Sequence, residues 1–161
     1  IHCSFPKRYG GNIRVVITKS KKNKIKIKNE NFFFHKFKKL QSSMEKWKKR
    51  KKVELLNLSK KYGPLSAKAF PGRASILIKL LNINEKVISE VYEKPNSKKI
   101  GHYLPGTTIP IKSDNKFLQN KNKIKIIINL AWHINKEIKI YLRKMGYKGK
   151  IIDILDSKDF K

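Results

Sequence analysis

The chain has 161 residues, of which 39% are hydrophobic, and its 40 basic and 11 acidic residues give a net charge of +29. This length and composition predict one domain with a real core plus attached material, and they exclude a disordered polycation. The single cysteine, Cys3, excludes an internal disulfide framework and a cysteine-built zinc site.

Residues 1–28 are predicted to form β structure. Branched apolar side chains recur at every second position in the stretches 13–18 and 25–27, and residues 9–12 form a turn before the first stretch. This segment is too small to bury a core alone. We therefore expect it to be the last strands of a domain whose body is missing. The start at Ile1 instead of Met adds the expectation of a fragment or processed product.

Residues 33–61 are predicted to form one long helix. Its apolar side chains fall on a single stripe, formed by Phe34, Phe37, Leu40, Met44, Trp47, Leu55 and Leu58. A helix of this length suits a connector between two domains, and a surface helix that packs on one domain is the alternative. The lysine-rich run 48–52 is interpreted as a solvated face, with a binding arm as the alternative.

Residues 64–161 alternate between strand and helix patterns. Strands are expected at 65–70, 86–92, 123–130 and 150–155, and helices at 75–81 and 134–145, with a short polar helix or loop at 113–120. This alternation predicts an α/β fold with a Rossmann-like, mostly parallel sheet and flanking helices, preceded by a β-hairpin remnant and a connector helix. We expect three parts: terminal strands of a truncated domain (1–28), a helical connector (29–63) and a Rossmann-like domain (64–161).

The turn 71–75 follows the first strand of that domain and opens a helix. Backbone N–H groups at such a point bind phosphate. Gly72 would allow close approach, Arg73 would pair with phosphate, and Ser75 would cap the helix or donate to an oxygen. Glu93 follows the turn at about the sequence spacing at which the acidic residue of a dinucleotide-binding fold reaches a ribose hydroxyl. The alternative is a tight structural turn.

Two later segments carry further candidates. A loop holds Lys99 and then the turn formed by Pro105, Gly106 and Thr107, and it is predicted to lie over the sheet edge. Trp132 and His133 follow a buried strand, where Trp132 offers a stacking face and His133 a hydrogen bond or a proton. The alternatives are a loop with only a structural role, a core tryptophan and a capping histidine.

Other kinds of site have little support in the sequence. The four histidines are scattered without metal-ligand spacing, and no pair of carboxylates is placed for acid–base work. No apolar run of about 20 residues and no secretory signal is present, so we expect no membrane partner and a cytoplasmic location. A complete active site, and hence a catalytic residue, is not expected within this chain.

Three segments in this order resemble a known family. The segments 68–75, 99–110 (Lys-Ile-Gly-His-Tyr-Leu-Pro-Gly-Thr-Thr-Ile-Pro) and 130–133 (Leu-Ala-Trp-His) are similar to the C-terminal domain of S-adenosylmethionine-dependent C-methyltransferases. Residues 9–15 resemble the end of that family's methyl-donor domain. The family often has Gly-Ala where this chain has Ala69 and Phe70, and Phe70 is expected to narrow the turn.

The resemblance implies a substrate-side Rossmann-like domain that closes over a nucleotide-linked sugar or a similar substrate. S-adenosylmethionine would be bound mainly by missing N-terminal domains, and no cofactor or metal is expected in this fragment alone, which would be inactive. The implied substrate-binding residues are Gly72, Arg73, Ala74, Ser75, Glu93, Lys99, Pro105, Gly106, Thr107, Trp132 and His133.

Two other functions compete with this interpretation. A basic nucleic-acid-binding module would explain the charge, but 35 of the basic residues are Lys and only five are Arg, the better reader of phosphate and guanine. Lys, Ile and Asn share AT-rich codons, so genome composition also explains the charge, and we expect only non-specific nucleic-acid binding. The second competing function is that of a stand-alone Rossmann-like nucleotide-binding protein.

Overall fold

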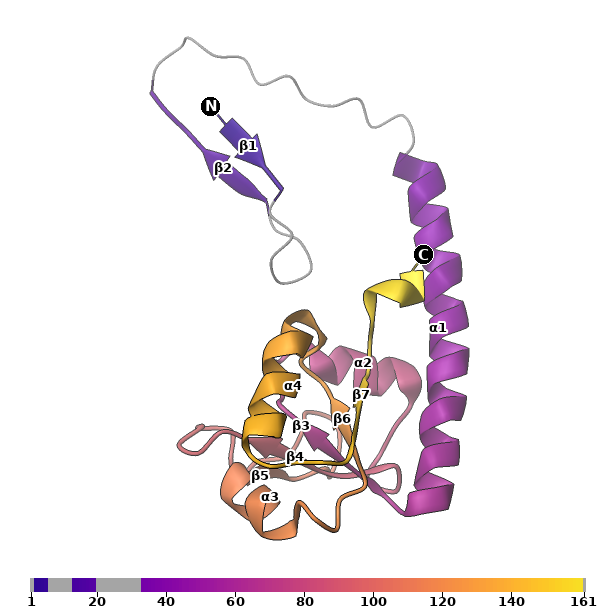
Figure 1. Cartoon of the computed structure of the whole chain (residues 1–161). Coiled ribbons are helices and arrows are strands. Elements are labelled where there is room, and N and C mark those ends of the chain that lie inside the picture. Colours follow the sequence, from indigo (N-terminus) through magenta and orange to yellow (C-terminus); the bar gives the residue numbers. More distant parts are fainter. Residues whose placement is uncertain (1, 6–12, 20–32, 161) are drawn as a thin grey trace. The chain divides into compact units, whose positions relative to one another are not determined.

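The structure is a computed structural model that describes residues 2–5, 13–19 and 33–160 (Figure 1). The chain divides into two compact units, Ile1–Lys39 and Leu40–Lys161, and each is described by itself. The predicted turn at 9–12 and the predicted strand at 25–27 lie outside the described residues. The proposed division into a methyl-donor remnant, a connector and a substrate domain stays a prediction.

The first unit holds a small antiparallel pair of strands. Strand β1 (His2–Ser4) pairs with β2 (Arg14–Val16), and Cys3 lies opposite Val15. Strand β2 falls inside the predicted stretch 13–18, where branched side chains favour an extended backbone. The predicted β-hairpin within residues 1–28 is therefore confirmed for the described residues, although its first strand, β1, lies before both of the predicted strand stretches.

The second unit alternates between strands and helices, as the sequence predicts. Its main elements are the greater part of α1 (Phe33–Tyr62), then β3 (Leu65–Lys68), α2 (Ala74–Leu81), β4 (Ile88–Glu93), β5 (Ile111–Ser113), α3 (Asp114–Asn120), β6 (Ile126–Asn129), α4 (Asn135–Lys144) and β7 (Lys150–Asp153). A 3₁₀ turn, η2 (Trp132–Ile134), precedes α4, and another, η3 (Ser157–Phe160), follows β7.

The five strands of this unit form one parallel sheet in the order β5-β4-β3-β6-β7 (Figure 1). Strand β3 is central and pairs with both β4 and β6. Strands buried on both faces need nearly continuous apolar sequence, which the run of isoleucines in β6 supplies. The predicted Rossmann-like α/β fold is confirmed.

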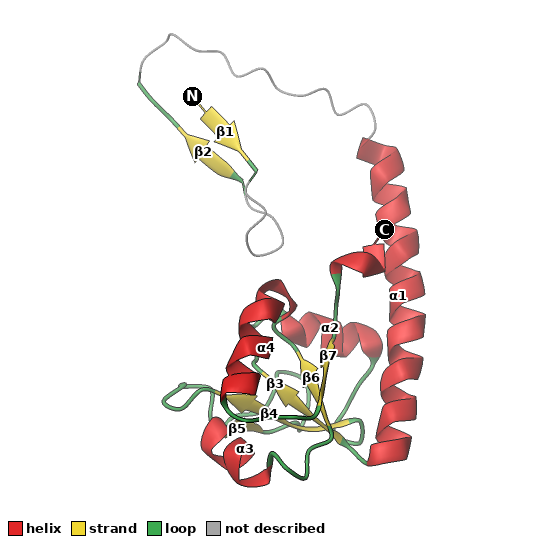
Figure 2. Cartoon of the chain, in the orientation of Figure 1, coloured by secondary structure: helices red, strands yellow, loops and turns green. Residues whose placement is uncertain are grey.

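Helices cover both faces of the sheet, and a hydrophobic core fills each side (Figure 2). Alternation along the strands separates the cores: Ala67 and Ile128 face α1 and α2, while Tyr92 and Ile127 face α3 and α4. Full burial of an isoleucine contributes about 1.5–3 kcal/mol. The two cores therefore hold the sheet and its helices together.

Helix α1 confirms the predicted 33–61 helix, but its apolar stripe is fully buried only from Trp47 onward. Trp47 and Leu55 lie in the core, and the Trp47 indole donates to the carbonyl of Ile154 at 3.2 Å. Phe34 and Phe37 are exposed. The second half of α1 thus packs on the sheet, as the surface-helix alternative expects, and a connector role for the first half stays a prediction.

Candidate functional site

The strand order determines where a ligand site belongs in this sheet. From β3 the chain builds outward through β4 to β5, and it then returns to place β6 on the other side of β3. Loops that leave the carboxyl ends of two such strands run in opposite directions, and ligands of open α/β sheets bind between them. We call this place the β3–β6 switch point and define it by residues 69–73 and 130–133.

The turn after β3 supplies a side-chain cation and few free amides. The backbone N–H groups of Ala74 and Ile76 donate to the carbonyls of Pro71 and Arg73 at 2.7 and 3.2 Å. Ser75 lies inside α2 and donates its hydroxyl to the Gly72 carbonyl, so it does not cap the helix. The expected cradle of free N–H groups is thus largely closed, whereas the exposed Arg73 remains available.

Arg73 reaches across the switch point to the loop after β6. Its guanidinium carbon lies 5.9 Å from the centroid of the Trp132 ring. The His133 ring stands edge-on to Trp132, with the two centroids 5.5 Å apart. The structure therefore brings together three of the predicted site residues, one from the β3 loop and two from the β6 loop.

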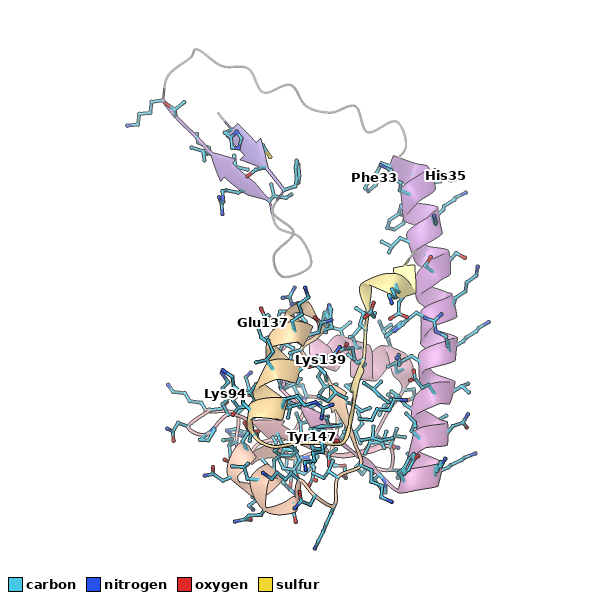
Figure 3. The ribbon with its side chains drawn as sticks, viewed as in Figure 1. Phe33, His35, Lys94, Glu137, Lys139 and Tyr147 are labelled. Carbon is cyan, nitrogen blue, oxygen red and sulfur yellow. The ribbon has the colours of Figure 1, made fainter. Side chains whose placement is uncertain are left out.

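The electrostatics of His133 agree with this arrangement. Burial lowers the pKa of the His133 imidazole, and the nearby Arg73 cation lowers it further. The carboxylate of Glu137, which lies on α4 (Figure 3), opposes this shift. His133 is therefore a neutral imidazole at pH 7, and Arg73 supplies the positive charge of the site.

Glu93 and Lys99 form hydrogen bonds with the backbone of the loop that follows β3. The Glu93 carboxylate accepts a hydrogen bond from the Phe70 amide at 2.6 Å, and the Lys99 ammonium donates to the Phe70 carbonyl, also at 2.6 Å. The Phe70 side chain lies in the core. It packs inward, and the expectation that it narrows the turn stays a prediction.

The Pro-Gly-Thr turn lies elsewhere on the domain. Pro105, Gly106 and Thr107 line a hollow of about 450 Å³ along α2, opposite Lys79 and Asn82. The next residue along the chain, Thr108, donates to Glu85, which precedes β4. This turn therefore points toward the amino end of the sheet. Ser75, in the first turn of α2, also lines the hollow.

A buried charge network that the sequence did not predict lies beside the switch point. The Lys68 ammonium, at the end of β3, contacts both carboxylate oxygens of Asp114 at 2.6 and 2.7 Å, and both side chains are 1% exposed. The Tyr141 hydroxyl donates to the same carboxylate at 2.7 Å. A lysine in the middle of a buried strand pattern was the available signal, because such a charge needs a partner.

This network shifts the pKa of its members. Burial lowers the Lys68 pKa, and the hydrogen bond that Lys68 donates to Asp114 only partly offsets that effect. Burial raises the Tyr141 pKa, and the neighbouring Asp114 carboxylate raises it further. Lys94, which lies beside α4 (Figure 3), holds its ammonium 5.1 Å from the Tyr141 ring centroid. The network joins the ends of β3 and β5 to α4.

Across residues 2–5, 13–19 and 33–160, no three His, Cys, Asp or Glu side chains are grouped as a metal site would require. Within the same ranges, no helix combines the length and the apolar composition that crossing a membrane requires.

A comparison with family models decides the family. The model described as the C-methyltransferase C-terminal domain matches residues 7–153. The chain belongs to this family. The match spans β2 through β7 and includes every candidate residue at the switch point. A comparison with curated proteins finds no match.

Membership gives the C-methyltransferase C-terminal domain its broad role. The chain is the C-terminal part of a C-methyltransferase, and the resemblance predicted from the three segments is confirmed. The switch point, with Arg73, Trp132 and His133, is the strongest candidate for this domain's own contribution.

Proposed function

We propose that this domain binds and orients the substrate of a C-methyltransferase at the β3–β6 switch point, and that the substrate is a nucleotide-linked sugar or a similar molecule. The observation that carries the proposal is the position of the Arg73 guanidinium over Trp132. It joins a cation and an aromatic face at the place where open α/β sheets bind ligands.

Each residue has a role that its chemistry supports. The planar guanidinium of Arg73 pairs with phosphate oxygens through two parallel hydrogen bonds. Trp132 offers its ring face to a base or sugar. His133, kept neutral by its lowered pKa, offers a hydrogen bond to a hydroxyl at the rim without adding charge. The contribution to catalysis is orientation, because a substrate held in one geometry reacts faster.

The methyl donor does not fit the switch point. S-adenosylmethionine carries a sulfonium cation, and the Arg73 guanidinium would repel it at this place. An anionic phosphate suits the same position. We therefore assign no methyl-transfer step to these residues, and we propose that the donor binds mainly to other parts of the enzyme.

The +29 charge supports a second, weaker kind of binding. We propose that nucleic acid binds only non-specifically, through lysines that neutralise phosphates. Such binding weakens steeply as salt is added and does not depend on base sequence. Substrate titrations therefore belong at about physiological ionic strength, where the general attraction of polyanions is screened.

Calorimetric titration tests the substrate proposal. The probes are UDP-glucose and dTDP-glucose, with glucose as a neutral control. Arg73→Ala is expected to weaken binding about 10- to 100-fold, the loss typical of a charge-assisted hydrogen-bonding group. The affinity of Arg73→Lys should fall between those of wild type and Arg73→Ala, because the positive charge is kept but the paired hydrogen bonds of the guanidinium are lost.

The control for this titration removes an equal charge from the other side of the sheet. Lys116 is exposed on α3, so Lys116→Ala should leave the affinity unchanged. Equal weakening by Arg73→Ala and Lys116→Ala would show a general charge effect and would refute a phosphate site at Arg73. Absence of binding by both nucleotide sugars would refute the nucleotide-sugar class.

A further inference from the structure

The loop after β3 contains a backbone conformation that its residue disfavours. Ala69 has φ of +60°, in the left-handed region where the Cβ atom crowds the carbonyl oxygen and where glycine is the usual residue. Such a conformation persists only where surrounding contacts enforce it. The contacts that enforce it here therefore matter for every residue that follows in the loop.

Three hydrogen bonds hold this strained backbone. The Ala69 amide donates to the Tyr92 carbonyl at 2.9 Å, which keeps the chain on β4 as β3 ends. The Phe70 amide donates to the Glu93 carboxylate, and the Lys99 ammonium donates to the Phe70 carbonyl, each at 2.6 Å. Both polar groups of the Phe70 backbone are thus bound by side chains from β4 and the loop after it.

The two side chains also support each other. The Lys99 ammonium lies 3.5 Å from the Glu93 carboxylate oxygen that accepts from Phe70. Glu93 is largely buried, at 13% exposure, and the Phe70 side chain is anchored in the core. We call Glu93, Lys99 and the Phe70 backbone the Phe70 clamp. Charged partners make these hydrogen bonds stronger than bonds between neutral groups.

The clamp lies directly before the residue that faces the switch point. Only Pro71 and Gly72 separate Phe70 from Arg73, and α2 begins at Ala74. The strand fixes one end of this loop, the helix fixes the other, and the clamp fixes its middle. A change of the backbone at Ala69 and Phe70 would therefore move Arg73 relative to Trp132.

We propose that Glu93 and Lys99 are positioning residues that hold the strained loop and so place the Arg73 guanidinium over Trp132. The sequence predicts instead that both side chains contact the ligand. The inference deepens the proposed function, since Arg73 is the residue that we assign to phosphate, but its claim concerns the ligand-free chain and is tested there.

Fluorine NMR of the whole chain labelled with 5-fluorotryptophan tests this placement. Trp47 and Trp132 are the two tryptophans, and Trp132→Phe assigns their resonances. Without ligand, Glu93→Ala should move the Trp132 resonance in the same direction as Arg73→Ala and leave the Trp47 resonance in place. Lys99→Met should cause a smaller shift, because the Glu93 bond to Phe70 remains.

Two further variants make the test specific. Glu85→Ala removes an exposed carboxylate at the opposite end of β4, where it accepts from Thr108, and should move neither resonance. Ala69→Gly removes the strain, so Glu93→Ala should shift the Trp132 resonance less in an Ala69→Gly background. This rescue also keeps the test valid if Glu93→Ala alone fails to fold, because the double variant should fold and show a Trp132 resonance near its wild-type position.

Three outcomes would overturn the proposal. They are an unmoved Trp132 resonance in folded Glu93→Ala, equal Trp132 shifts for Glu93→Ala and Glu85→Ala, and no rescue by Ala69→Gly. The first, combined with weaker UDP-glucose binding, would make Glu93 a ligand contact. A Trp132 shift in a chain that binds no nucleotide sugar would support the clamp while refuting the proposed function.

Discussion

The Arg73 guanidinium carbon lies 5.9 Å from the centroid of the Trp132 ring. This contact links the loop after β3 to the loop after β6, although 59 positions separate the two residues along the chain (132 − 73 = 59). At an exposed site a cation–π contact contributes about 0.5–1 kcal/mol. That is enough to favour one arrangement of the arginine, and it leaves the guanidinium able to turn toward a phosphate.

Removal of Arg73 should raise the pKa of His133. The Arg73 cation is the second cause of the lowered His133 pKa, after burial, so Arg73→Ala should move the pKa part of the way back toward its ordinary value. Titration of the imidazole Cε1 proton by NMR measures it. Lys116→Ala is the control, and an unchanged His133 pKa in Arg73→Ala would contradict the proximity of the two side chains.

The same shift predicts a loss of stability in acid. The folded chain holds the His133 pKa below its unfolded value, so the unfolded state binds more protons as the pH falls. Stability from this group is complete above the unfolded value of about 6.5 and is lost as the pH falls from there through the folded value. Urea unfolding at about pH 7.5 and 5 should show a smaller difference for His133→Asn than for wild type.

The buried pair of Lys68 and Asp114 should be costly to break from one side. Asp114→Ala leaves a buried ammonium without its carboxylate, which typically costs about 3–5 kcal/mol. Lys68→Met combined with Asp114→Asn should cost less, because no charge remains buried. Urea unfolding measures both. An exposed pair, Glu45 and Lys48, serves as the control, and its loss should cost at most about 1 kcal/mol.

Gly149 and Gly72 should differ in how well they tolerate replacement by alanine. A Cβ at Gly149 would lie 2.6 Å from the Lys125 carbonyl oxygen, a backbone atom, and would also collide with the Tyr147 ring. We expect Gly149→Ala to lower the free energy of unfolding by about 1–3 kcal/mol. At Gly72 nothing lies within 4 Å, so Gly72→Ala should change stability by less than about 0.5 kcal/mol. Equal effects in thermal or urea unfolding would contradict this packing.

The sequence predicted β3, β4, β6 and β7, because each of these strands carries its own signal, but it did not predict the short edge strand β5. The isoleucine run of β6 and the periodic face of α4 specify local structure and burial together. It also predicted the pairing of the 71–75 turn with Trp132, because the strand order of a Rossmann-like fold brings those carboxyl ends together.

Other relationships depend on contacts that no local pattern encodes. Lys68 and Asp114 are 46 positions apart, and an isolated lysine within a strand gives no indication of its partner. The spacing of Glu93 suggested a ribose contact, whereas its carboxylate binds the Phe70 amide. The path of a loop is set by packing, so the position of Pro105 along α2 did not follow from its turn signal.

The central claim is that a nucleotide-linked sugar binds at the β3–β6 switch point. Backbone amide NMR of the ¹⁵N-labelled chain, titrated with UDP-glucose and with dTDP-glucose, tests it most directly. We predict saturable shifts that are largest at Gly72, Arg73, Trp132 and His133 and that disappear in Arg73→Ala. Saturable shifts confined to Lys79 and Thr107 in the hollow along α2, or no saturable shift at the switch point with either sugar, would contradict it.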